Sequence, residues 1–90
     1  MAGMELEARL DELVRVAESL DLVIRRVPLG GDGGGFCVIK GRRVLFIDTS
    51  ADLDARYDRT LAALASLPGI ETRYLPPEVR ADLDRQRSES

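Results

Sequence analysis

Hydrophobic residues recur every three or four positions over roughly residues 4–21, with acidic residues between them. This spacing is typical of an amphipathic helix whose apolar side faces a core. Its acids lie partly in the first turns, where the helix dipole favours negative charge. The apolar positions are Leu6, Leu10, Leu13, Val14, Ala17 and Leu20.

A second stretch of helical period follows Asp48 and predicts a helix from Leu53 to about Leu67, ended by Pro68-Gly69. Thr49 and Asp52 have the spacing of a capping box, with Asp in place of the usual Glu. A last short helix is predicted to open at Pro76-Pro77, because proline fits the first helical turn. Its apolar anchors are Val79 and Leu83.

The segments between the helices favour strands. Residues 22–27 are rich in β-branched side chains and end at Pro28. The runs FCVIK and RVLFID flank a turn at Gly41-Arg42, which predicts a β-hairpin. Residues 70–74 alternate apolar and charged side chains, the pattern of a half-buried strand.

The expected order is helix, three strands, helix, strand and helix. It predicts one α+β domain over residues 1–90, with a small, mostly antiparallel sheet and helices mainly on one face. The strand ending at Asp48, the next helix and the strand at residues 70–74 would form a right-handed crossover. Residues 1–3 and 87–90 are expected to fray.

Charge is distributed unevenly along the 90 residues, whose net charge is −3. Residues 1–21 hold two arginines and six acids, whereas residues 22–47 hold five cations and one acid. The cations are Arg25, Arg26, Lys40, Arg42 and Arg43. Adjacent residues on a strand point to opposite faces, so only one of Arg25 and Arg26 can join the hairpin cations. Such a patch would bind an anionic metabolite, nucleic acid or an acidic partner, or else pair with acids of the first two helices.

Five glycines fall within the stretch LGGDGGGFC, residues 29–37. A phosphate loop would need a lysine, a Ser or Thr and a helix after the last glycine, but Phe36 and a strand follow. Asp32 alone does not supply the carboxylates of a calcium loop. We interpret the segment as a hairpin loop whose glycines supply positive φ angles. The alternative is a loop that closes over a ligand, with Gly33, Gly34 and Gly35 as binding candidates.

Catalytic chemistry has few candidates in this chain. It contains no histidine, which excludes His-based triads and histidine zinc sites, and we expect neither a metal nor a cofactor. Cys37 lies in an apolar run and is predicted to be a buried, inert side chain, with a thiol-dependent enzyme as the alternative. The acids Asp48, Asp52, Asp54 and Asp58 are explained by helix capping and a solvated face. The protein is therefore predicted not to be an enzyme.

The run GGGFCVIKGRRVLFID, followed by a helix and YLPPEVR, resembles a family of small uncharacterised bacterial proteins. That family has a G-G-x-C strand, a V-L-x-(I/V)-(D/N) strand and an L-P-P-x-(V/L)-R segment. The likeness covers about Leu20 to Arg85 and implies no assigned activity. More remotely, a hairpin ending in I-x-I-(D/N) before a helix resembles the start of the ImmA/IrrE-like metallopeptidases. Their H-E-x-x-H is absent here, since the corresponding helix reads TLAALASL.

Two functions therefore remain open: a non-catalytic protein-interaction module or homo-oligomer, and a domain that binds an anion or small ligand through the basic hairpin and glycine loop. The low content of aromatic residues, 4%, disfavours nucleic acid as a partner. No apolar run is long enough to cross a membrane, and no signal peptide is recognisable. With a single cysteine, these features favour a cytoplasmic protein.

Overall fold

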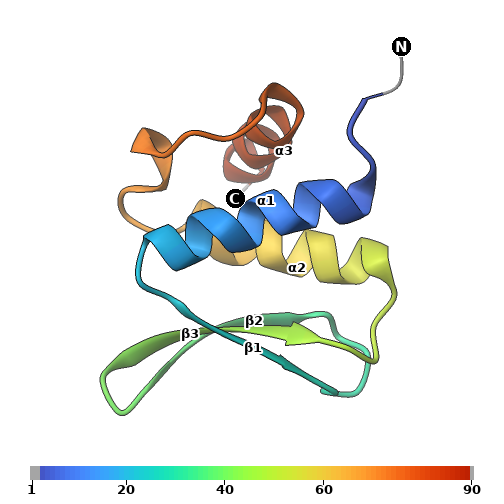
Figure 1. The fold of residues 1–90 in the computed structure, drawn as a ribbon, viewed down its shortest axis with the longest axis vertical. Coiled ribbons are helices and arrows are strands. Elements are labelled where there is room, and N and C mark those ends of the chain that lie inside the picture. Colours follow the sequence, from blue (N-terminus) through green and yellow to red (C-terminus); the bar gives the residue numbers. More distant parts are fainter. Residues whose placement is uncertain (1–2, 90) are drawn as a thin grey trace.

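The computed structural model describes residues 3–89, and Figure 1 shows the chain as a ribbon. Three helices, a short 3₁₀ helix and three strands follow one another in the order helix, three strands, helix, 3₁₀ helix, helix. Their bounds are α1 Leu6–Ser19, β1 Val23–Val27, β2 Gly34–Ile39, β3 Arg42–Asp48, α2 Leu53–Ala65, η1 Ile70–Thr72 and α3 Pro77–Ser88. The α+β class expected from the sequence is confirmed.

The elements are stacked in three layers (Figure 1). The sheet forms one outer layer, α1 and α2 cover one of its faces, and α3 packs on the far side of α1 and α2. Val79 and Leu83 of α3 have no exposed surface, as expected for its anchors. All the helices described thus lie on the same side of the sheet.

The sheet is mixed, which corrects the expectation of a mostly antiparallel one. β3 is the central strand, paired antiparallel with β2 and parallel with β1. Consequently the segment from Pro28 to Gly33 does not close a hairpin between neighbours. It crosses the end of β3 to connect the two edge strands. The predicted β2–β3 hairpin is confirmed, but its two-residue turn is Lys40-Gly41, where both residues have positive φ.

Asp52 is the N-cap of α2, and its carboxylate accepts a hydrogen bond from the Ala55 N–H at 2.8 Å. Thr49 makes no reciprocal contact of the capping-box type, so that part of the prediction is wrong. The core lies between the sheet and the helices, where Leu13, Leu45 and Leu64 are fully buried.

No strand forms at residues 70–74. Gly69 has φ 90° and starts the 3₁₀ helix, so the alternating pattern there does not correspond to a sheet face. Ile70 is buried in the core, whereas Tyr74 is 73% exposed. The crossover built on this strand is therefore absent. Near the end of the chain, α3 continues through residues 87 and 88, which were expected to fray, while residues 1, 2 and 90 lie outside the described part.

Candidate interaction surface

In the part of the chain that the structure describes, one face of the sheet carries no helix, and it is called here the open sheet face (Figure 1). Alternate residues of a strand point to opposite faces, and Leu45 and Ile47 of β3 belong to the core on the helix side. Val44 and Phe46, which alternate with them on β3, point away from the helices. So do the residues of β1 and β2 that pair with Val44 and Phe46. The open sheet face consists of Val23, Arg25, Cys37, Ile39, Arg42, Val44 and Phe46.

A shallow cavity of about 410 Å³ lies on this face. Its apolar lining comes from all three strands: Val23, Ile39, Val44 and Phe46. Val44 is only 5% exposed because it lies on the central strand among these neighbours, whereas Ile39 on the edge is 43% exposed. The face is therefore an apolar surface that the rest of the described chain does not cover.

Three of the five candidate cations converge on the same cavity: Arg25, Lys40 and Arg42. None of the three makes a side-chain hydrogen bond or ion pair within residues 3–89. Because they border an apolar floor and lack an internal counter-charge, they favour an anionic group on whatever contacts this face.

The other two candidate cations lie elsewhere. Arg26 points to the helix side and borders a cavity with Glu7 and Asp11 of α1. Arg43 donates a hydrogen bond to the Leu20 carbonyl, which ties the start of β3 to the end of α1. The structure thus separates Arg25 from Arg26, as strand geometry requires, and gives Arg43 a contact within the fold.

Cys37 is exposed, so the prediction that it is buried is wrong. It lies on edge strand β2 opposite Val44, on the face that no helix covers. Its apolar neighbours in sequence, Phe36 and Val38, are themselves 37% and 58% exposed. An apolar run in this chain therefore does not imply burial. Phe36 and Val38 are exposed because β2 is an edge strand, and Cys37 is exposed because no layer of the described chain covers the open sheet face there.

The glycine loop, residues 28–33, folds around the carboxylate of Asp48. The Leu29 and Gly31 N–H groups donate to it at 2.7 and 2.6 Å, and the Gly33 N–H donates at 3.2 Å. Ser50 adds its N–H at 2.9 Å and its hydroxyl at 2.5 Å. The loop does hold an anion, and that anion is a side chain of the same protein.

Asp48 has no exposed surface, which corrects its interpretation as part of a solvated acidic face. Burial alone would raise the pKa of its carboxyl, but the hydrogen bonds from Ser50, Leu29 and Gly33 outweigh burial and hold the pKa well below its usual range. The loop also approaches its neighbours closely. A Cβ on Gly33 would lie 2.6 Å from the Ala55 carbonyl oxygen, and one on Gly34 would lie 2.0 Å from that of Phe46.

The glycine loop and the basic turn do not form one site. They lie at opposite ends of β2, a six-residue strand that spans about 20 Å. Gly33 donates to Asp48, and the Gly34 carbonyl accepts from Arg59 at 3.3 Å. Gly35 lies opposite Phe46 with open space where a side chain would be. The loop amides that would cradle a ligand are therefore largely occupied within the fold.

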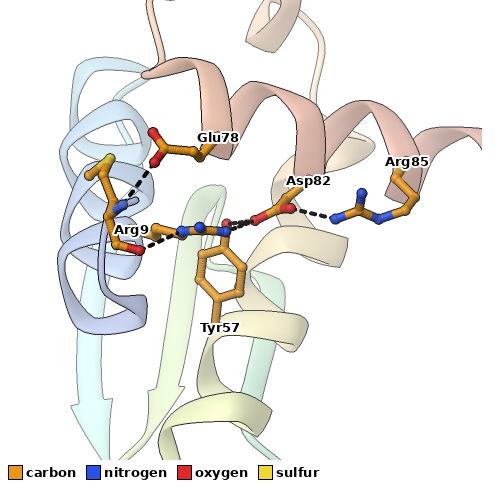
Figure 2. A network of polar contacts seen from close by, with 6 residues as sticks. Arg9, Tyr57, Glu78, Asp82 and Arg85 are labelled. Carbon is orange, nitrogen blue, oxygen red and sulfur yellow. Dashed lines mark hydrogen bonds and ion pairs between the residues drawn. The ribbon is translucent and has the colours of Figure 1, made fainter. Parts of the chain in front are cut away.

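A polar network that the sequence did not reveal connects the three helices (Figure 2). Asp82 of α3 accepts from the Tyr57 hydroxyl at 2.6 Å and from Arg9 of α1 at 2.9 Å. Burial tends to raise the pKa of Asp82, but the bonds from Tyr57 and Arg9 lower it overall. Burial and the bond to Asp82 raise the pKa of Tyr57. These contacts bind α3 to the other helices.

Comparison with known proteins gives no match: no known family, no curated protein and no solved structure is significantly similar to this chain. The family resemblance stated above therefore stays a prediction. Among residues 3–89, no group of three or more His, Cys, Asp or Glu side chains is placed to hold a metal ion. Within the same residues, no helix is both long and apolar enough to cross a membrane.

Proposed function

We propose that this protein is a non-catalytic interaction module whose open sheet face binds a segment of another protein that carries apolar and acidic side chains. The observation that supports this is the uncovered apolar surface bordered by Arg25, Lys40 and Arg42. Apolar contact would supply most of the affinity. The three cations would select acidic partners and speed their association.

A non-catalytic role fits the titratable groups. The acids whose pKa is lowered, Asp48 and Asp82, are both hydrogen-bonded inside the fold. The Cys37 thiol contacts only the Val38 carbonyl, at 4.0 Å, among the hydrogen bonds of the described chain. Within residues 3–89, no base or cation is bonded to this thiol to activate it as a nucleophile.

A second candidate function is binding of a small anion, because three cations share a cavity of about 410 Å³. The glycine loop would not take part, since its amides are bonded to Asp48. Titration with inorganic phosphate separates the two functions. A small-anion site saturates with phosphate alone, whereas a protein-docking face requires the apolar contacts as well.

The test uses the neighbours Arg25 and Arg26, which point to opposite faces of one strand. Tagged wild-type protein is incubated with a lysate of the source organism, and captured proteins are identified and quantified by mass spectrometry. We expect Arg25→Gln to reduce capture of a specific protein at least tenfold and Arg26→Gln, the matched control, to leave it unchanged. Capture should also fall steeply with salt, because exposed charges are screened.

Equal capture by the wild type and Arg25→Gln would contradict the proposal, as would equal losses in the two variants. Both variants are first shown to melt at the wild-type temperature, so that a loss of capture reports on the surface and not on the fold.

A further inference from the structure

Among residues 3–89, β2 is an edge strand with no neighbouring strand on its outer side. In an antiparallel pair, successive residues direct their backbone groups alternately toward and away from the partner strand. The Gly33 carbonyl accepts from Asp48 of β3, and the two-residue turn makes Ile39 and Arg42 a bonded pair. Odd-numbered residues of β2 therefore bond to β3. Gly34, Phe36 and Val38 direct their N–H and C=O groups outward.

The outward groups are largely unsatisfied. Within the described residues, the N–H groups of Phe36 and Val38 have no hydrogen-bond acceptor. The Gly34 carbonyl accepts from Arg59, and the Val38 carbonyl meets only the Cys37 thiol. Such a row of donors and acceptors is a template for another strand.

Natural edge strands are usually blocked by charged side chains, proline or a bulge. β2 reads GGFCVI and contains neither a charge nor a proline, and its register with β3 runs without a bulge. Of the five large hydrophobic side chains exposed in residues 3–89, three belong to this strand: Phe36, Val38 and Ile39. The outer edge of β2 therefore presents both unpaired backbone groups and exposed hydrophobic side chains.

We propose that the β2 edge pairs antiparallel with β2 of a second copy of this chain, about a two-fold axis through Phe36. The strand is self-complementary about that residue. Asp32 and Lys40 lie just beyond the two ends of β2, at equal distances in sequence from Phe36, so the pairing would bring opposite charges of the two copies to the same end of the paired strands. Gly34 would lie opposite Val38, so two residues whose backbone groups point outward would be paired. Gly34 has no side chain, which leaves room for that of Val38.

The result is a continuous six-stranded sheet with an isologous interface. Pairing uses the edge of β2, whereas the proposed function uses the face of the sheet. Lys40 borders both, but Arg25 and Arg26 lie on β1 at the opposite edge, so the capture assay with these two variants tests the proposed function separately. Both open sheet faces would remain available in the dimer, side by side on one surface.

The first test compares Val38→Pro with Val38→Ala by size-exclusion chromatography with light scattering over a range of concentrations. Proline removes the outward N–H of Val38 without touching a bond to β3, whereas alanine keeps that N–H and shortens the side chain. We expect the wild type and Val38→Ala to have twice the mass of one chain. Val38→Pro should run as a monomer or raise the dissociation constant at least tenfold.

A charge exchange keeps the proposal testable if Val38→Pro does not fold. Asp32→Lys places like charges across the axis and should weaken the dimer, and adding Lys40→Glu should restore it. A wild type that stays monomeric at several hundred micromolar would overturn the proposal. So would a dimer that is unaffected both by a folded Val38→Pro variant and by the charge exchange. Neither result changes the expected difference between Arg25→Gln and Arg26→Gln in the capture assay.

Discussion

The two faces of the same three-stranded sheet lie in opposite surroundings. On the helix side, Leu45 and Ile47 are 0% and 3% exposed beneath α1 and α2. On the open side, Val44 of the same central strand is 5% exposed because only side chains of neighbouring strands surround it, whereas Ile39 on the edge is 43% exposed and Cys37 is accessible. The third helix does not cover the open side either, because Val79 and Leu83 of α3 are buried against the other helices.

The comparison shows where this small protein places its apolar surface. Two helical layers on one side build a core thick enough for the fold, and the other side of the sheet keeps apolar side chains in contact with solvent. An exposed, contiguous apolar surface on a small domain marks an interaction site more often than a defect in packing. The following predictions test the contrast between the two faces, from the largest expected effect to the smallest.

Neighbours Leu45 and Phe46 on β3 give the most direct test, because they point to the two different faces. We expect Leu45→Ala to lower the free energy of unfolding by about 2–5 kcal/mol, since it leaves a cavity in the core. Phe46→Ala should cost about 1–2 kcal/mol, because its ring is only partly removed from water. Urea unfolding monitored by circular dichroism measures both. Equal costs would show that the open face is packed as tightly as the helix side.

Asp48 is a buried carboxylate at the last residue of β3, so its replacement tests what holds the glycine loop at this end of the sheet. In Asp48→Asn, the amide NH₂ would face N–H donors of the loop, and we expect the melting temperature at pH 7 to fall by about 5–10 °C. Asp52→Asn is the control, because asparagine remains a good N-cap for α2. A fall of similar size in both variants would contradict a special role for Asp48.

Lowering the pH should destabilise the fold by protonating the same Asp48 carboxylate. The pKa of Asp48 is lower in the folded protein than in the unfolded chain, so its contribution to stability is complete above the ordinary carboxyl pKa of about 3.9. That contribution is lost as the pH falls below this value. The melting temperatures of wild type and Asp48→Asn should therefore converge on acidification. A constant difference between pH 7 and pH 3 would count against this.

The accessibility of Cys37 tests whether the open sheet face is uncovered, and its replacement should have the smallest effect on the free energy of unfolding. A thiol reagent should label the folded protein completely, at a rate close to that of the unfolded protein, because the side chain is exposed on an edge strand. Cys37→Ala should change the free energy of unfolding by less than about 0.5 kcal/mol. Slow labelling that requires unfolding would place Cys37 in a covered environment and contradict the open sheet face.

Local patterns in the sequence predicted most of the elements. The helical periods of α1 and α2, the proline at the start of α3 and the turn chemistry before β3 are signals that lie within a few residues of one another. Residues 70–74 show the limit of such a signal. Their alternation resembles a strand, but Ile70 is buried by a 3₁₀ turn and no sheet edge lies nearby to pair with the segment.

The candidate surface was predictable only in part, because it depends on strand order. The split between Arg25 and Arg26 follows from the period of a strand. The pairing of β1 with β3 does not follow from any local pattern, because the glycine loop leads from β1 to β2 and not to β3. This pairing decides which side chains lie at an edge of the sheet. Asp48 and its loop partners are 15 to 19 residues apart, so no local pattern joins them. An acid that ends an apolar strand in a chain with a glycine-rich loop is the only available signal.

The Lys40-Gly41 turn has a consequence for the rate of folding. β2 and β3 are joined by two residues, whereas Val23 of β1 pairs with Val44, 21 positions along the chain (44 minus 23). Loop closure for the hairpin therefore costs little entropy, and we expect it to form before β1 docks. In stopped-flow experiments, changes in the turn should then slow folding. Changes in the glycine loop, which can close on Asp48 only after β1 and β3 have met, should instead speed unfolding.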